Sequence, residues 1–80
     1  MTADYHPISC EFHDLLELLA TARRPVPIRF LDAAGAEQHR SATITDVYAQ
    51  EGGEYLSMST GETVRLDRLV MVDGATVADY

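Results

Sequence analysis

The spacing of apolar residues changes from a helical period to an alternating one at Pro25, and this change constrains the fold more than any other feature of the sequence. Before Pro25, four apolar residues recur at i, i+3, i+4 and i+7: Phe12, Leu15, Leu16 and Leu19. This spacing places them on one face of a helix. After Pro25, apolar and polar residues alternate, as they do in half-buried strands. The pattern therefore predicts one N-terminal helix followed by a β-rich region.

The helix is predicted to run from about residue 10 to residue 22. Ser9 is suited to cap its first turn, because a serine hydroxyl accepts a hydrogen bond from a free N–H group there. Arg23 and Arg24 follow the last turn, where cations suit the negative end of the helix dipole. Pro25 then ends the helix, because proline cannot continue the hydrogen-bond ladder.

Five short strands are predicted after the helix, at residues 26–31, 38–49, 55–58, 63–66 and 69–72. Turns are expected at residues 32–35, 51–54 and 59–62, where Gly, Asp, Ser and Glu gather. The second strand is long and has Asp46 in its middle, which indicates a bend or bulge. Residues from Gly74 onward either add a short strand through Val77 or fray.

The connections between strands are too short for parallel crossovers, so each strand is expected to pair with its sequence neighbours. The sequence thus predicts a single α+β, mostly β domain over residues 1–80, with short flexible ends at about 1–4 and 74–80. A helix before five short antiparallel strands indicates a strongly bent sheet or small barrel, with the helix over one open end.

The predicted core lies between the helix and the barrel. Its members are Phe12, Leu16, Leu19, Ile28, Phe30, Ile44, Leu56, Leu66 and Val70. Cys10 is also expected to be buried and unreactive, where the N-terminal segment meets the barrel.

The net charge of −7 arises from 13 acidic residues against six arginines, and the chain has no lysine. Such a body repels polyanions, whereas binding to nucleic acid phosphates needs the opposite sign. A basic protein partner would be attracted and steered towards it. We therefore expect no direct binding to nucleic acid.

Localisation in the cytoplasm is expected from three features. No apolar run approaches the roughly 20 residues that span a bilayer. Residues 1–7 carry Asp4 and no Lys or Arg, unlike the basic start of a signal peptide. Cys10 is the only cysteine, so no internal disulfide forms. A membrane partner is not expected.

Metal binding and catalysis find little support in the sequence. The spacing of His6, Cys10 and His13 would suit a metal, but there is no C-x-x-C motif and no second cluster. We interpret these residues as a core cysteine and two surface histidines, with a metal-responsive regulator as an alternative. No nucleophile elbow is present, and so short a chain has little room for a deep pocket. No catalytic residue, metal or other cofactor is predicted.

Three carboxylates form a stripe on the helix face opposite the apolar residues: Glu11, Asp14 and Glu17. The stripe contains no Lys or Arg, and Leu18 lies at its edge. A charged helix face is usually a solvated one. An apolar residue beside like charges also fits a docking face, so both interpretations stay open at this point.

The N-terminal segment follows the pattern Y-x-P-I-x-C-x-x-x-D-x-L-E, which is matched by Tyr5, Pro7, Ile8, Cys10, Asp14, Leu16 and Glu17. Two shorter blocks, residues 53–56 and 64–69, read G-E-Y-L and V-R-L-D-R-L. With these blocks the chain resembles the Rho-binding antiterminators, the Rof family, over most of its length. The loop at residues 33–36 looks longer than that family's short turn.

The resemblance implies an Sm-like fold, with an N-terminal helix and a bent five-stranded barrel. It also implies an activity: binding to transcription termination factor Rho near its primary RNA-binding site, so that RNA loading is blocked. The residues expected to contact the partner are Tyr5, Glu11, Asp14, Glu17 and Leu18. The protein is expected to act by contact and not by catalysis, and to be a monomer when free.

A second class of function is an Sm-like RNA-binding module or another small regulatory interaction module. The acidic charge and the absence of lysine argue against RNA binding. Retention on heparin near physiological salt would distinguish an RNA-binding protein from an acidic inhibitor.

Overall fold

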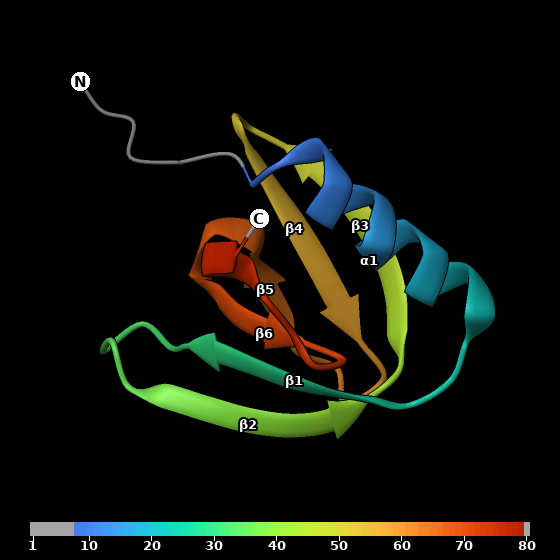
Figure 1. The fold of residues 1–80 in the computed structure, drawn as a ribbon. Helices are drawn as coiled ribbons and strands as arrows, with labels where there is room; N and C mark the ends of the chain where they lie inside the picture. Colours follow the sequence, from blue (N-terminus) through green and yellow to red (C-terminus); the bar gives the residue numbers. More distant parts are fainter. Residues whose placement is uncertain (1–7, 80) are drawn as a thin grey trace.

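One N-terminal helix is followed by seven antiparallel strands in two sheets in the computed structural model, which describes residues 8–79 (Figure 1). The elements are α1 (Cys10–Ala22), β1 (Val26–Leu31), β2 (Glu37–Ala42), β3 (Ile44–Gln50), β4 (Gly53–Met58), β5 (Thr63–Arg65), β6 (Leu69–Val72) and β7 (Ala75–Thr76). Two short 3₁₀ helices complete the chain, η1 (Leu66–Arg68) and η2 (Val77–Asp79).

Helix α1 has the predicted bounds and the predicted N-cap. The Ser9 hydroxyl accepts a hydrogen bond from the Phe12 N–H at 3.2 Å. At the other end Arg23 takes a left-handed conformation, with φ of 57°, and its N–H donates to the Leu19 carbonyl at 3.1 Å. A left-handed residue turns the chain out of the helix, so α1 ends before Pro25 is reached.

The two sheets have the strand orders β2-β1-β6-β7 and β3-β4-β5. Only Thr43 separates β2 from β3, and the pairing of β3 with β4 shifts register between Ile44 and Asp46. The bend predicted within residues 38–49 is therefore the point where the chain passes from one sheet to the other. The prediction of five strands was wrong, and no closed barrel is present within residues 8–79.

Strand pairing also departs from the expectation that only sequence neighbours pair. Strand β1 lies between β2 and the distant β6, with Ile28 opposite Val72. A central strand has hydrogen-bonding groups on both edges, and burial makes unpaired groups costly. Strand β6 pairs with the hydrogen-bonding groups on the second edge of β1. This pairing brings the C-terminal region back beside the first strand.

The turn between β3 and β4 is shorter than predicted. Glu51 and Gly52 have φ angles of 49° and 84°, which is the pattern of a two-residue type I′ turn. Gly53 and Glu54, expected in the turn, belong to β4. The predicted strand at residues 63–66 ends at Arg65, where η1 begins. Residues 75–79 form β7 and η2, and residues 1–4 lie outside the described part of the chain.

The core joins α1 to both sheets, and the helix packs on β3. Every predicted core residue is buried except Val70, which is half-buried. Leu69 and Val72 are buried in its place. The reason is η1, because residues three apart in a 3₁₀ turn point the same way, so Leu66 and Leu69 share one side. Alternation counted across residues 63–72 therefore fails at η1.

Within the described residues, none of the helices combines the length and the apolar character needed to cross a lipid bilayer.

Candidate docking face

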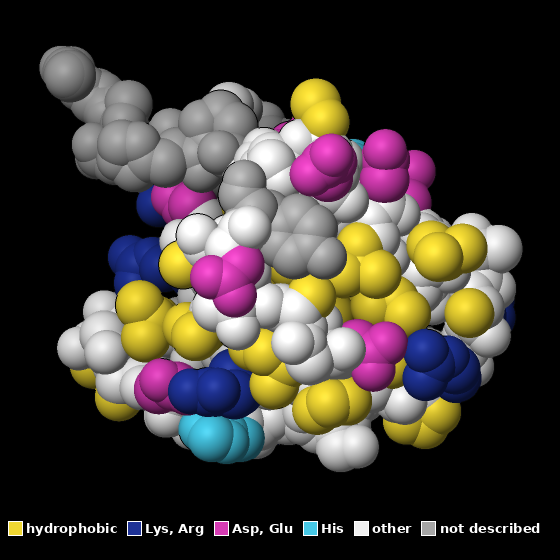
Figure 2. Space-filling view, viewed as in Figure 1, with side chains coloured by type: hydrophobic (Ala, Val, Ile, Leu, Met, Phe, Trp, Pro, Cys, Tyr) yellow, Lys and Arg dark blue, Asp and Glu magenta, His cyan; other side chains and the backbone are white. Residues whose placement is uncertain are grey.

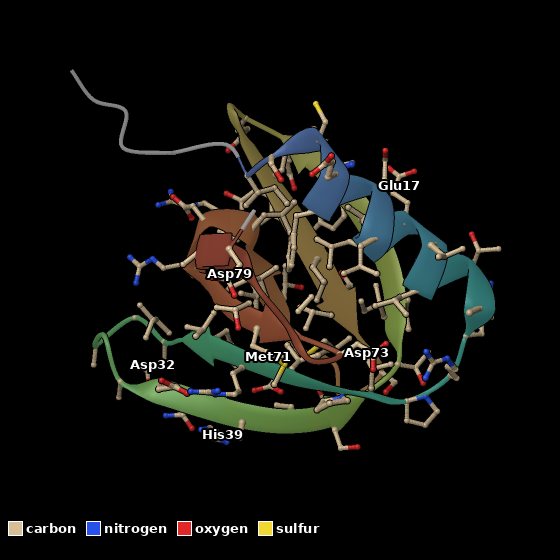
Figure 3. The ribbon with its side chains drawn as sticks, in the orientation of Figure 1. Glu17, Asp32, His39, Met71, Asp73 and Asp79 are labelled. Atoms are coloured by element: carbon tan, nitrogen blue, oxygen red, sulfur yellow. The ribbon has the colours of Figure 1, made fainter. Side chains whose placement is uncertain are left out.

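The face of α1 that points away from β3 is exposed and acidic. Glu11, Asp14 and Glu17 are all exposed, and the Glu17 side chain keeps 59 % of its surface accessible. Acidic side chains gather over the helix in the space-filling view (Figure 2), and Glu17 points out into solvent in Figure 3. The three carboxylates of the predicted stripe thus lie together on one exposed face.

Leu18 is an apolar residue on this same face. It is 64 % exposed, and Leu31 is the other large hydrophobic residue exposed within residues 8–79. Leu18 lies one turn after Asp14 and two turns after Glu11, so these side chains neighbour one another on the helix surface. An apolar side chain that the fold leaves in water beside carboxylates is a feature of docking surfaces.

His13 lies at the border of the acidic face, between α1 and β4. Its Nδ1 is 3.5 Å from a Glu17 carboxylate oxygen, and its Nε2 is 3.6 Å from a Glu54 carboxylate oxygen. The stripe therefore lacks Lys and Arg but has an imidazole beside it, which forms ion pairs with both carboxylates when it is protonated. Sequence reasoning missed this contact, although His13 and Glu17 stand at i and i+4.

Most of the arginines form ion pairs with carboxylates that lie outside α1. Four of the six arginines pair with carboxylates: Arg24 with Asp73, Arg29 with Glu37, Arg40 with Glu62, and Arg65 with Asp67.

The carboxylates without an arginine partner in the described part of the chain include Glu11, Asp14, Glu17, Asp46 and Glu51. These five come from α1, β3 and the β3–β4 turn, on the helix side of the molecule. Asp32, which follows β1, and Asp79 of η2 also lack an arginine partner in that part of the chain, so α1 and its neighbours carry much, but not all, of the unpaired negative charge that would attract a basic partner.

Cys10 is exposed, so the prediction of a buried thiol was wrong. It is the first residue of α1, and it stands four and seven residues before Asp14 and Glu17. This spacing puts it on the exposed face, a placement that the helical period already implied. The thiol lines a shallow hollow with Ile8, His13, Asp14 and Glu54.

Two predicted features involve residues outside the described part of the chain. Tyr5 was expected to contact the partner, and His6 was one member of the weighed metal cluster; both lie in residues 1–7. Within residues 8–79, no group of three or more His, Cys, Asp or Glu side chains is arranged to hold a metal ion.

The geometry of this face suits contact with a basic surface, since it is exposed, carries several carboxylates and has one apolar side chain among them. Comparison with protein-family models, curated proteins and solved structures found no match to this chain.

Proposed function

We propose that this protein is an inhibitor of transcription termination factor Rho, which binds Rho near its primary RNA-binding site and blocks RNA loading. The contact surface is the outward face of α1, with Glu11, Asp14, Glu17 and Leu18, joined by Tyr5 from the preceding segment. The protein acts by contact, without catalysis and without a cofactor.

We further propose that the two sheets are one Sm-like bent barrel that is open on one side. Two features support this. Strands β2 and β3 are separated by a single residue, Thr43, so they act as one bent strand. Strand β6 returns to pair with β1, which links the end of the meander to its beginning. The gap between β5 and β6, occupied by η1, is then the open side of the barrel.

The observation that carries the proposed function is the exposed Leu18 among carboxylates that have no arginine partner in the described residues. Sites that bind single-stranded nucleic acid combine cations for the phosphates with apolar or aromatic surface for the bases. A helix face with carboxylates around a leucine presents the complementary chemistry. It would occupy such a site in place of RNA.

Charge pairs at a partly exposed interface mainly set the encounter rate and the salt dependence of binding. Because Glu17 is 59 % exposed, the loss of one such pair should weaken binding by about 0.2–1 kcal/mol. Rising salt should weaken inhibition too, because screening acts on exposed charges.

The test is competition between this protein and a cytosine-rich RNA for Rho, at two salt concentrations. The variant removes two charges from the helix face, Asp14→Asn with Glu17→Gln, and should displace RNA less well. The control adds two positive charges on β2, His39→Lys with Ser41→Lys, at exposed positions on the opposite side of the molecule from α1 (Figure 1). Both variants have the same net charge, so a difference between them measures position and not total charge.

If both variants lost inhibition equally, the loss would be a non-specific effect of net charge. That result would contradict the proposal that the α1 face is the contact surface. Undiminished RNA displacement by the helix variant, or inhibition that does not weaken with salt, would contradict charge complementarity. If the protein instead bound the RNA directly in the absence of Rho, the alternative of an RNA-binding module would replace the proposal.

A further inference from the structure

A second surface feature lies on the far side of β4 from the acidic helix face. A groove of about 500 Å³ opens between the end of β1 and strand β5. Phe30, Leu31, Tyr55 and Val64 supply its apolar lining, and Leu31 is exposed within it. Arginine side chains lie beside apolar ones on the left of the space-filling view (Figure 2).

Strand β5 is the edge of its sheet and pairs only with β4. The Met58 N–H donates to the Glu62 carbonyl at 2.9 Å, and the register places Val64 opposite Leu56. In an antiparallel ladder the residues that bond to the partner strand alternate with residues that point away. The N–H and C=O groups of Thr63 therefore point away from β4, where a further strand could accept and donate hydrogen bonds.

The two carboxylates that line the groove, Asp32 and Glu62, already accept hydrogen bonds within the fold. Asp32 accepts hydrogen bonds from the Ala34 and Ala36 N–H groups and from the Gln38 amide, each at 2.9 Å. Glu62 accepts two from Arg40, at 2.9 and 3.0 Å. The charge of Glu62 is balanced by Arg40, whereas the donors to Asp32 are neutral groups, so Asp32 keeps its negative charge at the edge of the groove.

Arg68 is different, because it is a cation in the groove with no carboxylate partner among residues 8–79. Its Nη1 donates to the Asp32 carbonyl at 3.1 Å, and a guanidinium has five N–H donors. The half-buried Arg68 is therefore fixed in position by a neutral group while most of its donors stay available. The groove offers apolar surface and hydrogen-bond donors, which fits an occupant with apolar and acidic side chains.

We propose that the groove between β1 and β5 binds an extended peptide segment of a partner protein, which adds a strand to the edge of β5. The peptide's main chain pairs with the outward groups of Thr63. An apolar side chain lies over Leu31 and Val64, and an acidic side chain two residues away, on the same face of the peptide strand, binds Arg68. This site is separate from the α1 face and does not depend on the proposed inhibition of Rho.

The net charge of −7 does not prevent binding of an acidic side chain at this place. Charges on the α1 side are screened over about 8 Å at physiological salt, whereas a contact with Arg68 is direct. The acidic residue is therefore expected to add selectivity, and the strand pairing and apolar contact most of the affinity.

The test uses ¹⁵N-labelled protein and a labelled hexapeptide, Thr-Val-Leu-Val-Glu-Thr, at about 0.15 M salt and up to about 1 mM peptide. The amide signals of Leu31, Thr63 and Val64 should shift on binding. A peptide with Gln in place of Glu should bind about threefold more weakly, as expected for one partly exposed ion pair. A peptide with Pro in place of the second Val should not bind, because proline cannot donate to the strand ladder.

Arg68→Gln should weaken binding of the Glu peptide about threefold and abolish the difference between the Glu and Gln peptides. The matched control is Arg23→Gln, which removes an exposed arginine outside the groove and should bind as the wild type does. Leu31→Ala, at an exposed position, is a second variant that should bind more weakly if Arg68→Gln disturbs the fold.

Three results would overturn the proposal. The first is the absence of shifts at these residues with about 1 mM peptide. The second is equal binding of the Pro peptide, which would exclude strand addition. The third is the same set of shifts on concentrating the protein alone, which would assign the β5 edge to a second copy of this chain. Because no assay contains Rho, none of these results bears on the function proposed for α1.

Discussion

Arg40 of β2 and Glu62, which precedes β5, form a bidentate ion pair that joins the two sheets. Arg40 Nε lies 2.9 Å from Glu62 Oε1, and Nη2 lies 3.0 Å from Oε2. The guanidinium also lies 5.4 Å from the centre of the Phe30 ring. Bidentate geometry makes this pair stronger than an ordinary surface contact, and it ties β2 of one sheet to the residue that precedes β5 of the other.

We expect Glu62→Gln and Arg40→Met each to lower the urea midpoint of unfolding. The double variant should be little worse than either single variant, because each substitution removes the same pair. Urea titrations of all four proteins at low and high salt check this. Additive losses would mean that the two side chains stabilise the fold independently.

Stability should fall in acid through carboxyls whose pKa values the fold depresses. The Ala36 N–H, followed by the Gln38 amide, lowers the pKa of Asp32 below 3.8, and the Arg40 guanidinium lowers the pKa of Glu62 below 4.5. A depressed folded-state pKa adds stability that is fully present above the unfolded value and lost as pH falls through the folded value.

The thermal midpoint should therefore decline below about pH 4.5. The combined variant Asp32→Asn with Glu62→Gln should be less stable than the wild type at neutral pH and should show a shallower decline in acid. Thermal melts followed by circular dichroism between about pH 2.5 and 7 measure both. If the thermal midpoints of the two proteins fell equally steeply in acid, Asp32 and Glu62 would not be the source of the pH dependence.

Phe30→Ala should cost about 3–5 kcal/mol of unfolding free energy, because the Phe30 side chain is only 6 % exposed in the core. Its neighbour Leu31, 36 % exposed on the opposite side of β1, is the control, and Leu31→Ala should cost less than about 1 kcal/mol. Urea denaturation gives both values. Similar costs at the two positions would mean that β1 does not alternate as described.

Cys10 should react with a thiol reagent in the native protein at close to the rate measured in denaturant, since its side chain is exposed at the start of α1. The two rates are measured by following the reaction with the reagent spectroscopically, with and without urea. Protection of the native thiol by a factor of about 100 or more would show that the side chain is covered in solution.

Leu18→Ala should leave the unfolding free energy within about 0.5 kcal/mol of the wild type, because the residue is 64 % exposed. In the Rho competition assay it should weaken RNA displacement by about 1 kcal/mol, or roughly fivefold, if Leu18 enters an apolar pocket of the partner. Leu31→Ala removes the other exposed leucine and should displace RNA normally. If Leu18→Ala displaced RNA as well as the wild type does, Leu18 would not contribute to docking, and only the carboxylates would.

The features that could be read from the sequence are local ones. The bounds of α1 follow from Ser9, the 3.6-residue period and the approach to Pro25, which all act within a few residues of each other. The same period places Glu11, Asp14, Glu17 and Leu18 on the exposed face. For Cys10 the helical period predicts exposure correctly, because the residue lies on the outward face of α1. The general preference of cysteine for burial predicts the reverse.

Within the β-rich region the sequence determined which residues tend to be extended, because alternation is a property of neighbouring residues. It did not determine where the pattern breaks. Thr43 divides the second predicted strand, and η1 changes the phase so that Leu69 and Val72 are buried instead of Val70. Both breaks occur where the chain moves between sheets, and packing decides their position.

By itself, then, the sequence determined the helix, its acidic outward face and most of the core. The tertiary structure alone decided the pairing of β1 with β6, the Arg40–Glu62 pair, and the place of Arg68 beside the Asp32 carbonyl. These contacts join residues more than 20 positions apart, so no local period or motif encodes them. They form only when the folded chain has brought both partners together, because the entropy lost in closing each long loop is offset by the whole set of contacts and not by any one pair.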